Sequence, residues 1–149
     1  MPPVTPCLWF DGNAAAAVDR YVALFPKSRR LTDRSDDTPL MVEFELDRRP
    51  FKALNGGPDY HFTPAVSFFI ACESQAEVDH YWDGLIDGGE PSRCGWLVDG
   101  FGVSWQIVPN RPGELMSNPH TERSGRVVHA MLQMVQLDIA QLEAAAAGD

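Results

Sequence analysis

Three cysteines and four histidines are the side chains of this sequence best suited to nucleophilic or metal chemistry. The cysteines are odd in number, widely spaced and without a C-x-x-C pair: Cys7, Cys72 and Cys94. This spacing fits neither a disulfide framework nor a zinc ribbon, so we expect reduced, buried thiols in a reducing compartment. Cys94 lies at the entry to a predicted strand, but no neighbouring base would activate it, so we interpret it as a packing residue rather than a nucleophile.

The histidines and two turn aspartates also favour structural roles. No two histidines have the spacing of a metal-ligand pair, and they are His61, His80, His120 and His129. We therefore expect them to be surface or packing residues. Asp47 and Asp99 occupy equivalent turns, where a carboxylate commonly accepts hydrogen bonds from nearby backbone N–H groups. No acid–base pair is predicted.

The charge balance narrows the range of partners. The chain has 149 residues, with 21 Asp and Glu against 12 Lys and Arg, which gives a net charge of -9. This excess repels phosphate backbones and anionic lipid, so we expect neither a nucleic-acid nor a membrane partner. No apolar run approaches the roughly 20 residues that span a bilayer, and the N-terminus lacks a basic segment followed by an apolar one. We expect a cytoplasmic globular protein.

An internal repeat organises the chain. Residues 18–21 (VDRY) return as residues 78–81 (VDHY), and each copy follows an apolar segment of strand type. Residues 44–47 (FELD) return in the same order as residues 96–99 (WLVD). Matching order around both pairs predicts a duplication, in which each copy reads strand, helix, strand, strand, strand.

Local signals place the elements of each copy. Apolar residues at helical spacing predict helices over residues 14–25 and 76–86, with Asn13 and Ser74 as N-caps. Residues 41–46 alternate between apolar and polar side chains, which predicts a strand with one buried face. The two copies therefore predict an α+β fold of two tandem βαβββ modules.

The boundaries follow from these elements. We expect one domain over residues 1–109, with modules at about 4–58 and 64–109. A turn-rich linker over residues 110–123 then leads to a single C-terminal helix over 124–147. One apolar stripe runs along that helix, so it should dock on the domain or on a dimer partner.

Six segments, spread over nearly the whole chain, carry a family resemblance: residues 9–13 (WFDGN), 51–58 (FKALNGGP), 62–69 (FTPAVSFF), 75–79 (QAEVD), 94–97 (CGWL) and 101–109 (FGVSWQIVP). With the repeat, they resemble the vicinal oxygen chelate superfamily (glyoxalase/bleomycin resistance/dioxygenase). The nearer likeness is to its PhnB-like branch, often labelled 3-demethylubiquinone 3-methyltransferase-like. The resemblance implies that the modules form a cupped mixed sheet, which is completed either within one chain or across a homodimer. We expect this protein to be a homodimer.

The resemblance also implies where a metal would bind. In the superfamily, His, Glu or Gln side chains from the first and last strands of each module hold a divalent ion. The matching positions here are Thr5 or Cys7, Asn55 or a neighbour, Ser67, and Gln106. None of them carries a carboxylate or an imidazole, and neutral oxygens bind divalent ions weakly. We therefore expect no cofactor and no metal site, with a divalent metal disfavoured.

Strand alternation then predicts what the cup offers to a ligand. If Gln106 faces the cup, Ser104 does too, while Trp105 and Ile107 face the helices. The expected binding residues are aromatic, small or amide-bearing: Trp9, Phe51, Asn55, Ser67, Phe69, Trp96, Ser104 and Gln106. Such a wall suits a small, flat, largely apolar molecule. A collapsed core that binds nothing is the alternative.

The sequence is compatible with a binding protein and with an enzyme. The preferred reading is a protein that binds a small apolar molecule in the cup without the usual metal. The alternative is a metal-dependent lyase, isomerase or dioxygenase-type enzyme of the same superfamily. The methyltransferase label is disfavoured, because the sequence contains no glycine-rich G-x-G-x-x-G turn.

Overall fold

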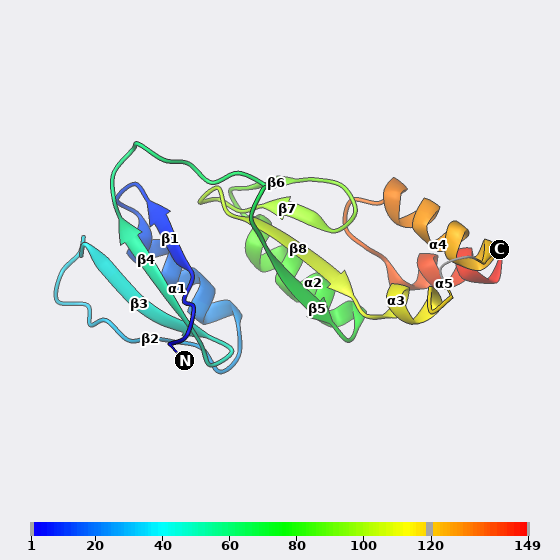
Figure 1. Ribbon diagram of the computed structural model, residues 1–149, viewed down its shortest axis with the longest axis horizontal. Helices are drawn as coiled ribbons and strands as arrows, with labels where there is room; N and C mark the ends of the chain where they lie inside the picture. Colours follow the sequence, from blue (N-terminus) through cyan, green and yellow to red (C-terminus); the bar gives the residue numbers. More distant parts are fainter. Residues whose placement is uncertain (1, 119–120, 149) are drawn as a thin grey trace. The chain divides into compact units, whose positions relative to one another are not determined.

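The computed structural model describes residues 2–118 and 121–148 and divides the chain into two compact units, residues 1–62 and 63–149 (Figure 1). Unit 1 consists of β1 (Cys7–Phe10), α1 (Ala14–Leu24), β2 (Arg29–Arg30), β3 (Met41–Leu46) and β4 (Arg49–Asn55). Unit 2 consists of β5 (Ser67–Cys72), α2 (Gln75–Ile86), β6 (Glu90–Pro91), β7 (Trp96–Val98), β8 (Ser104–Pro109), α3 (Arg111–Leu115), α4 (Glu122–Gln133) and α5 (Ile139–Ala147).

The two units contain the same sheet. The strand order is β1-β4-β3-β2 in unit 1 and β5-β8-β7-β6 in unit 2. In each sheet the first strand pairs in parallel with the last strand, and the remaining pairs are antiparallel. The parallel pair requires a crossover connection, which α1 and α2 begin. The predicted α+β fold with tandem βαβββ modules is confirmed.

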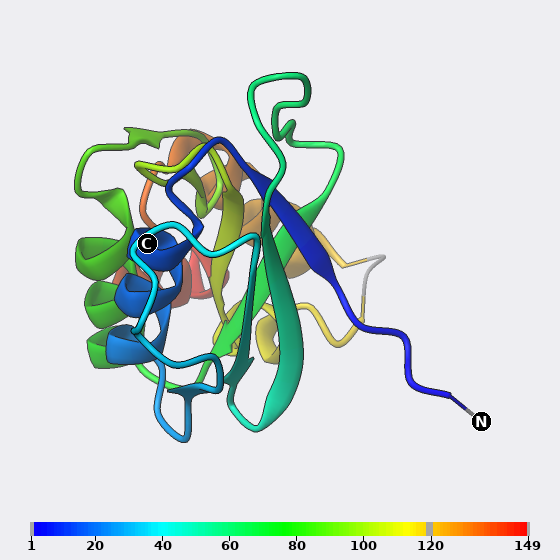
Figure 2. The same ribbon diagram turned by 90° about the vertical axis from the view of Figure 1, so that its left-hand side faces the viewer.

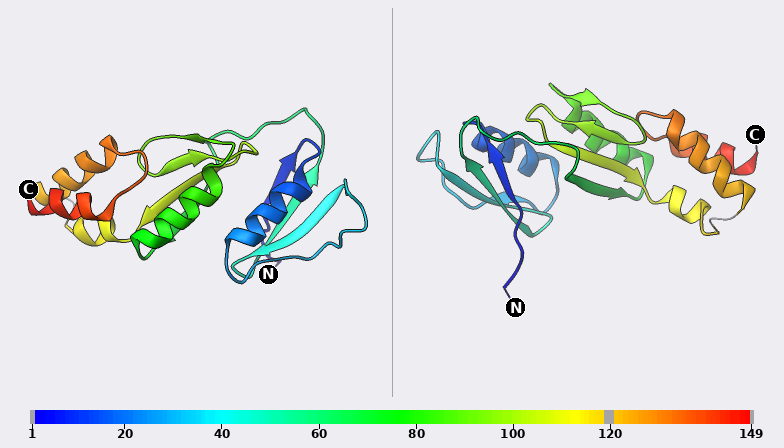
Figure 3. Two further views of the ribbon diagram at one scale, coloured as in Figure 1. Left: turned by 180° about the vertical axis from the view of Figure 1, so that it is seen from behind. Right: turned by 45° about the horizontal axis from the view of Figure 1, so that its top comes forward.

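One helix covers one face of each sheet (Figures 2 and 3). In unit 1, α1 buries four residues at helical spacing: Ala14, Ala17, Val18 and Tyr21. They pack with alternate, buried strand residues, among them Val42, Phe44 and Leu46. In unit 2, α2 buries Val78, Trp82 and Leu85 over Leu97, Trp105 and Ile107. Burial of apolar area on this side is what drives each module to fold.

The two helix N-caps differ from each other. Ser74 caps α2 as predicted, because its Oγ accepts a hydrogen bond from the Glu77 N–H at 3.2 Å. Asn13 makes no side-chain cap bond. The first N–H of α1, on Ala14, donates instead to Asn55 Oδ1 at 2.9 Å. The predicted cap is therefore wrong, because a residue distant in sequence, at the end of β4, reaches the helix first.

The single helix expected over residues 124–147 is two helices, α4 and α5, and the expected linker contains α3. The break has a backbone cause. The N–H groups of Cys94 and Gly95 donate to the carbonyls of Met134 and Val135, each at 2.8 Å. These bonds tie residues 134–135 to the segment just before β7, so α4 ends before them. Asp138 then caps α5 by accepting a hydrogen bond from the Gln141 N–H at 3.0 Å.

The three C-terminal helices share a small core of their own, made of Leu115, Val127, Leu142 and Ala146. Gln75 joins the start of α5 to α2. Its Nε2 donates to the Leu137 carbonyl at 3.1 Å, and its Oε1 accepts from the Ile139 N–H at 2.8 Å. Within residues 2–118 and 121–148, each helix is too short or too polar to cross a lipid bilayer.

Gln75→Ala should lower the free energy of unfolding by about 1–3 kcal/mol, because two partly buried backbone groups lose their partner. Gln141→Ala is the matched control, since that side chain is exposed. Urea unfolding followed by circular dichroism measures both variants. Equal losses in the two variants, or no loss at Gln75, would contradict this attachment.

Candidate functional site

The sheet of unit 2 presents two chemically different faces. Along β8, Trp105 and Ile107 are buried on the α2 side, while Gln106 is only half-buried. Gln106 pairs with Phe69 on β5 and with Trp96 on β7. Paired residues on neighbouring strands lie on the same face of a sheet. The side opposite α2, here called the helix-free face of unit 2, is formed by Ser67, Phe69, Ala71, Trp96, Val98, Ser104, Gln106 and Val108.

A row of three side chains crosses this face. Phe69, Gln106 and Trp96 stand side by side on three adjacent strands. Phe69 is 59% exposed, which is unusual for a phenylalanine on a sheet face. The predicted alternation of β8 is confirmed, with Gln106 on the side away from the helix.

Two polar groups on this face are fixed in place. Gln106 Nε2 donates to Ser67 Oγ at 2.9 Å, which orients the carboxamide. Ser104 is 1% exposed, and its Oγ has no hydrogen-bond partner within the part of the chain that the structure describes. A buried hydroxyl without a partner costs free energy, so Ser104 is a locally unfavourable feature of this face.

In unit 1, Trp9 lies on the face opposite α1. Its Nε1 donates to the Gly57 carbonyl at 2.9 Å, and its ring meets that of Tyr60 edge-on with centroids 4.9 Å apart. A Cβ atom at Gly56 would come within 2.4 Å of the Trp9 ring, so only glycine fits there. The turn after β4 therefore fixes this indole.

Phe51 and Asn55 do not share that face. Trp9 pairs with Leu54, and Phe10 pairs with Asn55, so Asn55 lies on the α1 side. Asn55 Nδ2 donates to the Pro39 carbonyl at 2.8 Å, besides its cap bond to α1. Phe51 stacks on the buried Phe44 with centroids 5.3 Å apart. The expectation that these two residues face the same cavity as Trp9 is wrong, because a register offset of one residue reverses the face.

The donor set does not suit a divalent metal. Ser67 and Gln106, the two positions of unit 2 where the resemblance implies ligands, hydrogen-bond to each other and offer only neutral groups. Among the described residues, no three His, Cys, Asp or Glu side chains lie close enough to share an ion. The absence of a metal site stays a prediction, and no reaction step is derived through a metal.

Cys72, Cys94 and the described imidazoles fit the roles expected of them, whereas the prediction of a buried thiol is wrong for Cys7, which is exposed. Burial raises the pKa of the Cys94 thiol, which opposes formation of a nucleophilic thiolate. Burial also raises the pKa of Cys72 to about 11. His61 and His129 are exposed, and His80 packs edge-on against Tyr81. His120 lies outside the described residues.

Asp99 is a structural acceptor, as its turn position predicted. Its Oδ1 accepts from the N–H groups of Phe101 at 2.8 Å and Val103 at 3.0 Å. Its Oδ2 accepts from Trp105 Nε1 at 2.9 Å. The carboxylate thus fixes the β7–β8 turn and the tryptophan that packs under the sheet. The sequence indicated the turn bonds of Asp99 but not its bond to the Trp105 indole.

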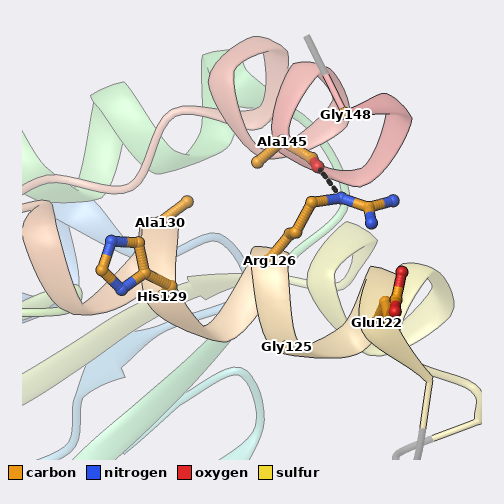
Figure 4. A pocket seen from close by; sticks show the side chains of 7 residues that line it. All are labelled: Glu122, Gly125, Arg126, His129, Ala130, Ala145 and Gly148. Carbon is orange, nitrogen blue, oxygen red and sulfur yellow. Dashed lines mark hydrogen bonds between the residues drawn. The ribbon is translucent and has the colours of Figure 1, made fainter.

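A depression of about 520 Å³ lies between α4 and α5 (Figure 4). Small residues open it, among them Gly125, Ala130 and Ala145. Arg126 beside it donates from Nε to the Ala145 carbonyl at 2.9 Å and from Nη2 to the Ala146 carbonyl at 2.7 Å. These bonds satisfy the last carbonyls of α5, so Arg126 has a structural role here.

Comparison with known proteins identifies relatives for most of the chain. Residues 2–108 match the family model described as 3-demethylubiquinone-9 3-methyltransferase. A solved structure titled putative 3-demethylubiquinone-9 3-methyltransferase, PhnB protein, from Bacillus cereus is 27% identical and has a TM-score of 0.66. The match covers 72% of this chain and 99% of that one.

Two further solved structures share the fold. One, from Pseudomonas aeruginosa, is 18% identical with a TM-score of 0.59, over 73% of this chain and 98% of that one. The other, from Arabidopsis thaliana, is 19% identical with a TM-score of 0.51, over 70% of this chain and 96% of that one. Comparison with curated proteins gave no match. The family match ends before α3, so the C-terminal helices lie outside it.

Asn55→Ala should lower the free energy of unfolding by about 2–3 kcal/mol, because the α1 cap and the bond to Pro39 are both lost. Asn13→Ala is the control and should cost less than about 0.5 kcal/mol, because Asn13 makes no side-chain cap bond. Urea unfolding compares them. A loss at Asn13 as large as that at Asn55 would show that the cap is assigned to the wrong residue.

Proposed function

The chain belongs to the 3-demethylubiquinone-9 3-methyltransferase family, and on that premise we propose that it is a PhnB-like glyoxalase-fold protein that binds a small, flat, largely apolar molecule. The proposed site is the helix-free face of unit 2. The observation that carries the proposal is the row of Phe69, Gln106 and Trp96, in which two aromatic rings flank an oriented carboxamide.

The spacing of the row supports a planar ligand. Neighbouring strands lie about 4.8 Å apart, so the backbones of Phe69 and Trp96 are separated by about 9.6 Å. Aromatic rings stack with centroids about 4.5–7 Å apart, so one ring can lie above Gln106 with a side chain on either side. The carboxamide oxygen of Gln106 then offers a hydrogen bond to a polar edge of the ligand. Trp9 remains a predicted binding residue of unit 1 and is not part of this row.

Two other functions are weaker candidates. A metal-dependent lyase, isomerase or dioxygenase would need anionic or imidazole ligands, and the matched positions of unit 2 carry serine and glutamine. Stabilisation against heat by Mn, Fe, Zn, Ni or Co would support it. Methyl transfer is named in the family description, but the sequence has no glycine-rich nucleotide turn. Calorimetry with S-adenosylmethionine tests this directly.

We also propose that the protein is a cytoplasmic homodimer. Several large apolar side chains are exposed in the single chain: Leu40 at 71%, Tyr60 at 67%, Val66 at 70% and Phe69 at 59%. A second copy is the partner that could cover them and complete the cup. The three cysteines are free, which suits a reducing compartment.

Probe binding tests the proposed site, with 2-naphthol and naphthalene as a matched pair. We expect 2-naphthol to bind about tenfold more tightly, because only its hydroxyl can donate to Gln106. Gln106→Leu should abolish that difference, and Phe69→Ala should weaken both probes. Leu132→Ala is the control, since Leu132 is 56% exposed on α4. Equal binding of both probes in every variant, measured by calorimetry, would refute the site.

Sedimentation velocity tests the dimer. At micromolar concentration we expect a species of twice the chain mass, and Val66→Asp should dissociate it because a charge would be buried in the interface. Val128→Asp on α4, where the valine is 44% exposed, should leave the dimer intact. A strict monomer for the unaltered chain would contradict the proposal.

A further inference from the structure

A cluster of basic residues stands out in unit 1. Five of the 12 Lys and Arg residues fall within residues 27–30 and 48–49, in a chain with a net charge of -9. The two segments border one depression of about 460 Å³, lined by Lys27, Ser28, Arg29, Glu45 and Arg48. Clustered cations in an acidic chain create a local positive potential that attracts anions.

The backbone beneath this cluster is strained. Lys27, Asp47 and Arg48 have positive φ angles of 55°, 48° and 64°. Left-handed backbone costs a residue other than glycine about 1–2 kcal/mol. Asp47 and Arg48 form the two-residue turn between β3 and β4, a type of turn that favours Asn-Gly or Asp-Gly. Arginine therefore occupies a turn position where glycine would be more stable.

Hydrogen bonds hold the two turns together. The Arg48 N–H donates to the Lys27 carbonyl at 3.0 Å. The Asp47 N–H donates to Ser28 Oγ at 3.0 Å, and this hydroxyl donates to the Pro26 carbonyl at 3.1 Å. The backbones that carry Lys27 and Arg48 are therefore fixed side by side, so little ordering is needed before their side chains act together.

The cations at the two turns differ in how they are paired. Arg29 Nε binds Glu45 Oε2 at 3.0 Å, which neutralises much of its charge. Lys27 and Arg48 are exposed, and neither forms an ion pair with any residue that the structure describes. Glu45, the one acid among the described residues that line the depression, is paired with Arg29, and Asp47 lies in the turn beside Arg48. The depression therefore retains positive charge.

We propose that this depression is a phosphate-binding site, in which Lys27 and Arg48 bind the phosphate group of a small molecule and Arg29 lies at its edge. A guanidinium can donate two parallel hydrogen bonds to two phosphate oxygens, and an ammonium adds a point charge. The net charge of the chain repels an extended polyanion, so the ligand is a single phosphate rather than a nucleic acid. The site is independent of the aromatic row in unit 2.

Titration of the ¹⁵N-labelled chain tests the proposal. The probes are inorganic phosphate, phenyl phosphate and, at equal ionic strength, sodium chloride. Both phosphates should shift the amide signals of residues 27–29 and 45–48, and chloride should not. The shifts should weaken as salt is added, because exposed charges are screened. Tighter binding of phenyl phosphate than of inorganic phosphate would identify an organic phosphate as the ligand. Equal binding of the two would show that the site contacts the phosphate group alone.

Arg48→Gly separates binding from stability. Phosphate affinity should fall by about tenfold or more, since a charge-assisted contact is lost. The melting temperature should not fall, because glycine relieves the left-handed strain. Lys27→Gln should weaken phosphate binding in the same way. It provides a second test if Arg48→Gly changes the structure of the turn.

Arg49→Gln is the matched control, because it removes the same charge from a neighbouring residue that does not line the depression. It should keep phosphate affinity within about twofold of the unaltered chain. The proposal is overturned if neither phosphate causes localised shifts, if Arg49→Gln weakens binding as much as Arg48→Gly, or if an acidic peptide binds here more tightly than phosphate.

Discussion

Each sheet of this molecule has two faces and only one helix to cover them, and this imbalance underlies the rest of the structure. In unit 2, α2 buries Trp105, Ile107 and Leu97, so the alternate residues of the same strands must point the other way. Asp99 reinforces the division, because it holds the Trp105 indole and the β7–β8 turn with one carboxylate. The row of exposed Phe69 and half-buried Gln106 and Trp96 is a consequence of how the core is packed on the opposite side.

Strand alternation let the sequence predict the faces of unit 2 but not those of unit 1. In β8 the alternation could be read directly, because Trp105 and Ile107 are large and apolar while Gln106 is polar. In β4 the residues Phe51, Ala53 and Asn55 share the α1 side, and Asn55 is the polar member of that buried set. In the sequence alone, a polar residue that caps a distant helix looks the same as a polar residue that lines a binding site. The pairing of β1 with β4 distinguishes the two roles, because it places Asn55 on the α1 side of the sheet.

The prediction of a single C-terminal helix was wrong for a similar reason. Apolar spacing predicted one helix, and the spacing does not show that Met134 and Val135 accept hydrogen bonds from the backbone of Cys94 and Gly95. Long-range backbone bonds overrode local helical preference there. The basic cluster of unit 1 was not evident from the sequence either, because the net charge averages over the chain. Lys27 and Arg48 come together only because β2 pairs with β3 and the Arg48 N–H donates to the Lys27 carbonyl.

The central claim is that the uncovered face of unit 2 is the part of the molecule that binds a ligand. A crystal structure of the protein grown with a planar aromatic compound tests it most directly. The account predicts density for the compound between Phe69 and Trp96, with a polar atom within hydrogen-bond distance of the Gln106 carboxamide. A face filled by tightly packed side chains, or carboxylates and imidazoles gathered around a bound cation there, would contradict it.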